Sequence, residues 1–257
     1  MNTGDIQINE NTNRYWGFWA TLLLTILVFI VFSIVQTLGI FAYFYVADPD
    51  VFQSLNDSSS NTAINQFLSQ DLLNGDAIAI GEIPAAIVGV LLILWFASMR
   101  KPLTVDEYLD LNVPSLKSML AFLGLIILAM VLMESVNYFW DRPTPEFMTK
   151  VYANTKNLPL FWIAVSVGAP FFEEFLFRGF MYKGIARSKI GVIGAIIITS
   201  AVWAVIHMQY GWFEIIAIFL IGILLCIAKI KSKSLYVPIA MHMLMNLSAS
   251  ISMELMH

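Results

Sequence analysis

Long apolar runs separated by short polar segments make up most of the chain. Runs of about 18 or more apolar residues are typical of membrane-spanning helices. Because these runs are continuous rather than alternating, a transmembrane β-barrel is not expected. The pattern predicts an all-α polytopic integral membrane bundle of about seven transmembrane helices, within a range of about six to eight. The predicted spans are approximately Tyr15–Val46, Ala77–Met99, Ser118–Trp140, Pro159–Met181, Ile190–Gln209, Trp212–Ala228 and Leu235–Met253.

The composition agrees with a membrane protein. Hydrophobic residues account for 59% of the chain and charged residues for 12%, whereas a soluble domain carries about 25% charged residues. A soluble cytosolic enzyme is therefore excluded. The net charge of −4 indicates no nucleic-acid partner. The single cysteine, Cys226, lies within an apolar run and cannot form an intramolecular disulfide.

We expect residues 1–257 to form a single membrane domain. Residues 1–158 would hold the N-terminal spans and a polar outer loop at 48–76, and residues 159–253 would form the core that carries the chemistry. The loop contains five aspartates and no lysine or arginine. Positive charge favours the cytoplasmic side, so we expect the N-terminus in the cytoplasm and the C-terminus outside. Ten basic residues fall on the expected cytoplasmic side: Arg14, Arg100, Lys101, Lys117, Lys183, Arg187, Lys189, Lys229, Lys231 and Lys233.

The fourth predicted span contains charged residues that a lipid environment disfavours. Glu173, Glu174 and Arg178 stand among five phenylalanines, and a charge in the bilayer core costs several kcal/mol. Adjacent residues of a helix point to different faces, while Glu174 and Arg178, four residues apart, can form an ion pair. Glu173 is left without a local partner and would suit a general acid or base. Pro170 should kink the helix just before it.

Two histidines are the other unusual polar residues in the spans. His207 ends the fifth span, and His242 lies in the seventh, where Asn246 follows on the same helical face. If these residues converge with Glu173, a carboxylate and an imidazole could activate a water, and His242 with Asn246 could stabilise an oxyanion. Alternatively, Glu173, His207 and His242 could bind a divalent metal such as zinc. Both arrangements would hydrolyse an amide within the membrane.

The motifs resemble the CPBP family, which includes type II CAAX prenyl endopeptidases and bacterial Abi-type proteins linked to bacteriocin processing or immunity. The family pattern is Glu-Glu-x-x-x-Arg, then Phe-x-x-x-His, then His-x-x-x-Asn/Asp. The first motif is matched by Glu173-Glu174-x-x-x-Arg178 and the third by His242-x-x-x-Asn246. The second departs, because Trp203 stands four residues before His207 where the family has phenylalanine. The resemblance covers roughly residues 159–250.

The resemblance implies an intramembrane endopeptidase, often classed as a metalloprotease, that acts on a membrane-associated protein or peptide. By position, Glu173 would activate water with help from His207. His242 and Asn246 would stabilise the oxyanion. Glu174 and Arg178 would hold the site in shape. A bacterial cell membrane is the expected location.

Two other functions fit the same residues. A non-catalytic scaffold or bacteriocin-immunity protein could bind a peptide in the pocket without cutting it. A proton-coupled transporter could use the carboxylate and the histidines as a relay.

The positions of two groups of residues lead to further expectations. At 1.5 Å per residue, Glu173 lies about 21 Å from the outer end of its span and His207 about 25 Å from the inner end of its own, so tilt, a kink or different helix boundaries must bring them to one depth.

Three further acids, Glu82, Glu134 and Glu214, fall near the outer ends of their spans. We expect these three to lie at the membrane interface.

Overall fold

The chain folds into a bundle of helices, as predicted. The structure is a computed structural model that describes residues 14–51, 53 and 61–256, and within these it is entirely helical apart from loops. The α-helices are α1 (Phe18–Ala47), α3 (Asn61–Ser69), α4 (Gly75–Ser98), α5 (Val105–Leu109), α6 (Leu116–Phe139), α7 (Glu146–Ala153), α8 (Leu158–Ile163), α9 (Ala169–Glu173), α10 (Tyr182–Ala186), α11 (Gly191–Val205), α12 (Trp212–Ser232) and α13 (Tyr236–Met256). A 3₁₀ turn, η2 (Asp71–Leu73), and two π-helical segments, η3 (Ala164–Gly168) and η4 (Glu174–Met181), complete the order.

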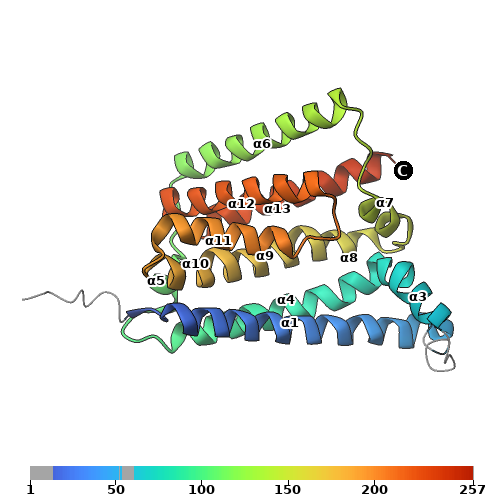
Figure 1. The fold of residues 1–257 in the computed structure, drawn as a ribbon, viewed down its shortest axis with the longest axis horizontal. Coiled ribbons are helices and arrows are strands. Elements are labelled where there is room, and N and C mark those ends of the chain that lie inside the picture. Colours follow the sequence, from blue (N-terminus) through green and yellow to red (C-terminus); the bar gives the residue numbers. More distant parts are fainter. Residues whose placement is uncertain (1–13, 52, 54–60, 257) are drawn as a thin grey trace, which may run out of the picture.

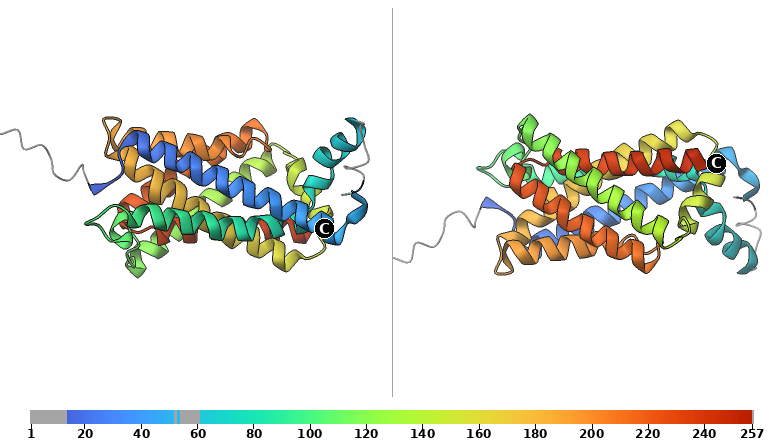
Figure 2. Two further views of the ribbon diagram at one scale, coloured as in Figure 1. Left: turned by 90° about the horizontal axis from the view of Figure 1, so that it is seen from below. Right: turned by 90° about the horizontal axis from the view of Figure 1, so that it is seen from above.

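The long helices run roughly along one direction (Figure 1). Helices α1 and α4 pack against each other and form one side of the bundle. The segment from α8 to α10, with α11, α12 and α13, occupies the middle, and α6 crosses the opposite side (Figure 2). Most side chains of α6 are exposed, which is expected of a helix that faces lipid.

Each of the seven predicted apolar runs forms helix, with boundaries shifted by a few residues. Five helical segments of the described chain are long and apolar enough to cross a membrane: Phe18–Ala47, Gly75–Ser98, Leu116–Phe139, Leu158–Ala186 and Trp212–Ser232. Helix α11 is apolar but only 15 residues long. Helix α13 carries His242, Asn246 and three serines and falls outside that set.

The basic and the acidic connecting segments lie at opposite ends of the bundle. The links α4–α6, α10–α11 and α12–α13 meet at the end where α1 begins, while α3, η2 and α7 lie at the other end, near the C-terminus (Figure 1). We call these the basic end and the C-terminal end. The loop predicted at 48–76 is partly helical, since α3 and η2 form within it, and residues 56–60 of its polar run lie outside the described residues.

Small residues allow α1 and α4 to approach closely. A Cβ added to Gly39 would lie 2.6 Å from the Cα of Gly81, and a Cβ on Gly81 would lie 2.6 Å from the carbonyl oxygen of Gln36. Close packing through small residues is a common way for membrane helices to associate. About two turns further along α4, Phe172 of α9 packs onto Gly89 and stacks on Phe32 with ring centroids 4.1 Å apart. The α1–α4 pair is thereby fixed against the segment that carries Glu173.

The segment Leu158–Ala186 is irregular around its charged residues. Near Pro170, where the sequence predicts a kink, the backbone is π-helical over Ala164–Gly168, just before the proline, and a second π-helical segment begins at Glu174. Proline has no backbone N–H to donate, so the regular hydrogen-bond ladder must change there. Single π-helical turns within α-helices are frequent at functional sites.

Candidate active site

Glu174, Arg178 and His242 form a buried ionic cluster in the middle of the bundle. The Glu174 Oε1 accepts from the Arg178 Nη1 at 2.8 Å and from the His242 Nδ1 at 2.9 Å. All three side chains are buried, and the i,i+4 ion pair is the one predicted. The Glu174 Oε2 and the Arg178 Nε have no hydrogen-bond partner among the described residues. Because buried charges are costly unless paired, the loss of any one of these contacts should destabilise the cluster.

Trp203 contacts Glu173 as well as the two residues that bind Glu174, Arg178 and His242. Its indole Nε1 donates a hydrogen bond to the Oε2 of Glu173. The guanidinium of Arg178 lies over its ring, 4.4 Å from the centroid. The rings of both histidines meet Trp203 edge to face, His207 at 5.3 Å and His242 at 5.2 Å between centroids. The tryptophan that departs from the family pattern is therefore the residue around which the predicted site residues gather.

His207 lies in the turn that follows α11. Its Nδ1 is 2.7 Å from the backbone carbonyl of Trp203. A carbonyl oxygen can only accept, so the Nδ1 carries a hydrogen and donates it. In the neutral imidazole the lone pair is then on Nε2. The half-buried His207 thus has a defined tautomer and a basic nitrogen that this contact leaves free.

Asn246 is held by the first π-helical segment. Its Nδ2 donates to the carbonyl oxygen of Val165, within η3, at 2.8 Å. An amide NH₂ group has two hydrogens, so this contact occupies one and leaves the second for another acceptor. The prediction that His242 and Asn246 project from one face of a helix toward the site agrees with their contacts to Glu174 and Val165.

The three acids expected at the interface have different surroundings. Glu134 is exposed, and Glu214 lies near the C-terminal end of the bundle, paired with Arg142 at 2.8 Å. The expectation for Glu82 is wrong, because its side chain is only 6% exposed. Its position in the chain suggested a helix end, but α4 begins at Gly75, and α1 covers the second turn, where Gln36 donates to Glu82.

The residues named as potential metal ligands do not form a metal-binding group. Within the described part of the chain, no three His, Cys, Asp or Glu side chains are close enough together to hold one metal ion. The donor set expected for zinc is therefore not assembled among the residues that the structure describes.

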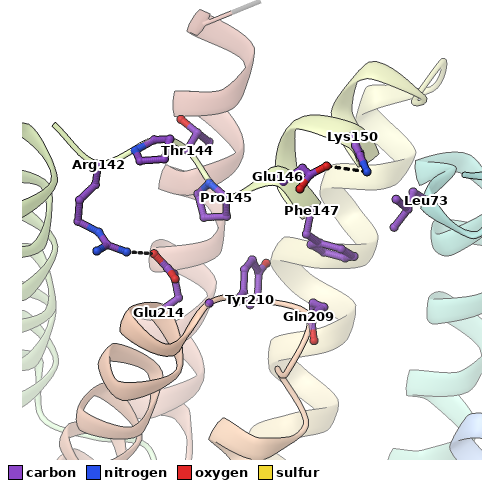
Figure 3. A pocket seen from close by; sticks show the side chains of 12 residues that line it. Leu73, Arg142, Thr144, Pro145, Glu146, Phe147, Lys150, Gln209, Tyr210 and Glu214 are labelled. Atoms are coloured by element: carbon purple, nitrogen blue, oxygen red, sulfur yellow. Dashed lines mark hydrogen bonds and ion pairs between the residues drawn. The ribbon is translucent and has the colours of Figure 1, made fainter. Parts of the chain in front are cut away.

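A pocket of about 610 Å³ opens next to the site at the C-terminal end of the bundle. Figure 3 shows its wall, which is formed by the segment before and within α7 and by the turn that follows α11. Two ion pairs line it, Arg142–Glu214 and Lys150–Glu146. Tyr210 lines the pocket and also stacks on His207, with 6.3 Å between ring centroids. Tyr210 therefore connects the pocket to the site.

Tyr210 remains protonated at neutral pH. Burial, together with the nearby carboxylate of Glu173, raises the pKa of Tyr210 to about 12. Its phenol therefore keeps a hydrogen that it can donate. The Phe147 ring packs against the Tyr210 ring in a T-shaped arrangement, with 5.5 Å between centroids. Sequence inspection did not identify Tyr210, because a lone tyrosine in a turn carries no signal of its own.

Helix boundaries remove the difference in depth between Glu173 and His207. Helix α11 ends at Val205, so the turn that bears His207 lies beside the middle of the segment Leu158–Ala186 rather than at its end. The hydrogen bond between Trp203 and Glu173 shows that the two segments meet at this level. The segment of Glu173 continues past the predicted end at Met181 to Ala186, so Glu173 lies about 20 Å from its basic end, close to the value of about 24 Å for His207 from the start of α11.

Comparison with known proteins agrees with the resemblance seen in the motifs. Residues 155–248 match the family model described as type II CAAX prenyl endopeptidase Rce1-like. At the level of that family, the match supports a membrane protease. The matched region contains every predicted site residue but covers less than half of the chain.

Two bacterial relatives share part of the sequence. A membrane-embedded CAAX protease, MroQ, of Staphylococcus aureus (strain USA300) is 29% identical over 102 residues, which cover 38% of this chain and 40% of the relative. An uncharacterized 24.3 kDa protein of Escherichia coli is 35% identical over 108 residues, which cover 39% of this chain and 48% of the relative. The alignments thus span half or less of each relative's length. No solved structure matches the chain significantly.

Proposed function

We propose that the protein is an intramembrane endopeptidase that hydrolyses a peptide bond in a membrane-associated protein or peptide. The observation that supports this most strongly is the meeting of Glu173, His207 and His242 around Trp203, inside a bundle of apolar helices. Ionisable residues within a membrane bundle generally mark a functional site. The family match at residues 155–248 supports hydrolysis over other uses of the same groups.

Glu173 is the general base in this proposal. Trp203 holds the Oε2 of Glu173, which leaves the Oε1 to accept a proton from water. His207 assists through its Nε2, which lies opposite the Nδ1 that is held by the carbonyl of Trp203. A base positioned in this way contributes a factor of about 10² to 10⁴ to the rate.

His242 and Asn246 stabilise the oxyanion that forms when water attacks the peptide carbonyl. The Nδ1 of His242 donates to Glu174, so His242 must also carry a hydrogen on Nε2 to donate to an oxyanion. Asn246 supplies its second amide hydrogen. Groups that are held in place before the reaction stabilise the developing charge most effectively.

The pocket beside Tyr210 is the proposed route by which the substrate reaches the site. Its paired charges suit the polar backbone of a peptide, and Tyr210, which lines it, stacks on His207 of the site. We further propose a bacterial cell membrane as the location, with the N-terminus in the cytoplasm. Both matched relatives are bacterial, and the basic connecting segments gather at the end where α1 begins.

The test is cleavage of fluorogenic membrane-associated peptides, farnesylated and unprenylated, by purified protein. We expect Glu173→Gln to lower the cleavage rate at least about a hundredfold without changing the thermal stability of the protein. We expect His207→Ala and His242→Ala to lower the cleavage rate as well. The matched control is Glu134→Gln, which alters an exposed carboxylate of another span. Equal cleavage by wild type and Glu173→Gln would contradict the proposal.

A further inference from the structure

A group of cations that the proposed mechanism does not use lies at the basic end of the bundle. The guanidinium of Arg187 lies over the ring of the buried Tyr15, 3.8 Å from its centroid. The Nζ of Lys183, in α10, lies 5.3 Å from the same centroid. The ring of Tyr108, in α5, packs against Tyr15 with 5.0 Å between centroids. The chain before α1, helix α5 and the end of α10 therefore meet around one aromatic ring.

The buried lysines of this end share a single carboxylate. Lys183 and Lys229 are both buried, and each binds one oxygen of Asp110 at 2.7 Å. Lysines are almost never fully buried unless they are paired. Here two ammonium groups face one carboxylate, so one positive charge is left over before Arg187 is counted.

Arg187 adds a further positive charge. Its side chain is exposed and takes part in none of the ion pairs of the described residues. The acid of α5, Glu107, is bound within its own helix, where its Oε2 accepts from the backbone nitrogen of Thr104 at 2.8 Å and from the Thr104 hydroxyl at 3.1 Å. Because Tyr15 covers one face of the guanidinium, N–H groups along its edge remain for a ligand. The ligand that fits this site is an anion.

The cations lie where the membrane-spanning segments end. Helix α1 begins at Phe18, and α10 ends at Ala186, directly before Arg187. At the same end, Trp19 in the first turn of α1 and Trp95 in the last turn of α4 are 74% and 57% exposed. Tryptophan is enriched at the level of the lipid headgroups. The anions within reach at this level are the phosphate groups of lipids.

We propose that Arg187, held on the Tyr15 ring, binds the phosphate group of an anionic phospholipid in the leaflet next to the basic end. A guanidinium binds phosphate through two parallel hydrogen bonds, and the excess charge of Lys183 and Lys229 strengthens the attraction. Basic groups between membrane helices are typical of sites for anionic headgroups. The site is independent of the proposed peptidase function. A bound headgroup stabilises the contact between the chain before α1 and α10.

Thermal unfolding in lipid nanodiscs tests the site with phosphatidylglycerol as the probe. The unfolding temperature of wild type should rise with the fraction of phosphatidylglycerol in phosphatidylcholine and reach a plateau. Arg187→Gln should raise the half-saturating fraction about tenfold, because it removes one charged hydrogen-bonding group. Lys189→Gln is the matched control, since it removes another exposed cation of the same end, and it should keep the wild-type curve. Equal losses in the two variants would indicate diffuse attraction to a basic surface and would overturn the proposal.

Each variant is compared with itself in phosphatidylcholine alone, so that a general loss of stability does not imitate a loss of binding. If Arg187→Gln does not fold, Arg187→Lys should still weaken the response, because an ammonium cannot form the two parallel hydrogen bonds of a guanidinium. An unchanged response of Arg187→Lys, or no response of wild type, would overturn the proposal.

Soluble glycerol phosphate separates the two possible sources of the phosphate group. Added to wild type in phosphatidylcholine alone, it should not reproduce the stabilisation by phosphatidylglycerol. Full stabilisation by glycerol phosphate would identify a soluble phosphate as the ligand and would overturn the assignment to a lipid.

Discussion

At the scale of single residues, the site is organised by contacts between residues far apart in the chain. The sequence motifs identified Glu173, Glu174, Arg178, His207, His242 and Asn246 because charged and polar side chains are rare in apolar spans. They could not show that Trp203 would bind Glu173, since that contact joins residues 30 apart in sequence. Glu82 was misjudged for a similar reason, because its partner Gln36 lies on another helix.

Arg178 should contribute strongly to stability. Replacing it by methionine leaves Glu174 as a buried charge with only His242 beside it, and breaking a buried pair in this way costs about 3–5 kcal/mol. Arg178→Met should therefore lower the thermal unfolding temperature in detergent markedly. The double variant Glu174→Met/Arg178→Met should lose less than the sum of the two single variants, because it removes both charges.

The control for this experiment is the other i,i+4 ion pair. Lys150 and Glu146 are 2.7 Å apart but substantially exposed, and exposed pairs contribute at most about 1 kcal/mol. Lys150→Met should therefore change the unfolding temperature little. A similar loss for Lys150→Met and Arg178→Met would show that burial of the ionic cluster does not determine its contribution.

At the scale of helices, hydrophobic runs predicted the elements well and their irregularities poorly. All seven apolar runs are helical. The π-helical segments on either side of α9 and the early end of α11 were not predictable, because they arise where helices pack against one another. Only Pro170 gave a local signal. The approach of α1 to α4 depends on two glycines whose pairing also requires the folded structure.

Close packing at Gly81 should be sensitive to a single methyl group. The Cβ of Gly81→Ala would lie 2.6 Å from the backbone oxygen of Gln36, so α1 must move, at a cost of about 1–3 kcal/mol. Thermal unfolding should register this as a lower transition temperature. Gly124→Ala is the matched control, because a Cβ on Gly124 of α6 has no atom within 4 Å. A stable Gly81→Ala protein would contradict the packing described for α1 and α4.

At the scale of the whole molecule, the two ends of the bundle are built differently. At the basic end, Asp110 binds Lys183 and Lys229 through its two carboxylate oxygens, each at 2.7 Å. Its backbone oxygen accepts from Leu235. This residue thus joins the loop after α5 to α10, α12 and the start of α13. The C-terminal end instead holds the pocket and its two ion pairs, of which Lys150–Glu146 is exposed.

Asp110 should make stability depend on pH in a defined range. Although burial acts to raise it, the ammonium groups of Lys229 and Lys183 hold the pKa of Asp110 below its ordinary value. A carboxyl group whose pKa is lower in the folded than in the unfolded state stabilises the fold at pH values above its unfolded-state pKa. For aspartate this unfolded-state pKa is about 3.9. The unfolding temperature of wild type should therefore exceed that of Asp110→Asn down to about pH 4, and the difference should shrink in more acid solution. Asp106→Asn, which alters an exposed acid of α5, should leave the curve of wild type unchanged.

The orientation of the two ends can be measured with thiol labelling in intact cells. Cys226 is buried and should not react. If basic segments face the cytoplasm, a membrane-impermeant reagent should label Ala153→Cys at the C-terminal end but not Val113→Cys at the basic end. Both positions are exposed. Labelling of Val113→Cys alone would reverse the orientation proposed here.

The shortness of α11 has a consequence for the surrounding lipid. A helix of 15 residues spans about 22 Å, less than the hydrocarbon thickness of a bilayer, which is about 30 Å. The acyl chains next to its C-terminal turn must therefore compress, or polar headgroups must sink toward His207. Thinning of this kind would admit solvent to the middle of the membrane near Glu173, so bilayers of longer acyl chains should hold the site drier and slow any hydrolysis there.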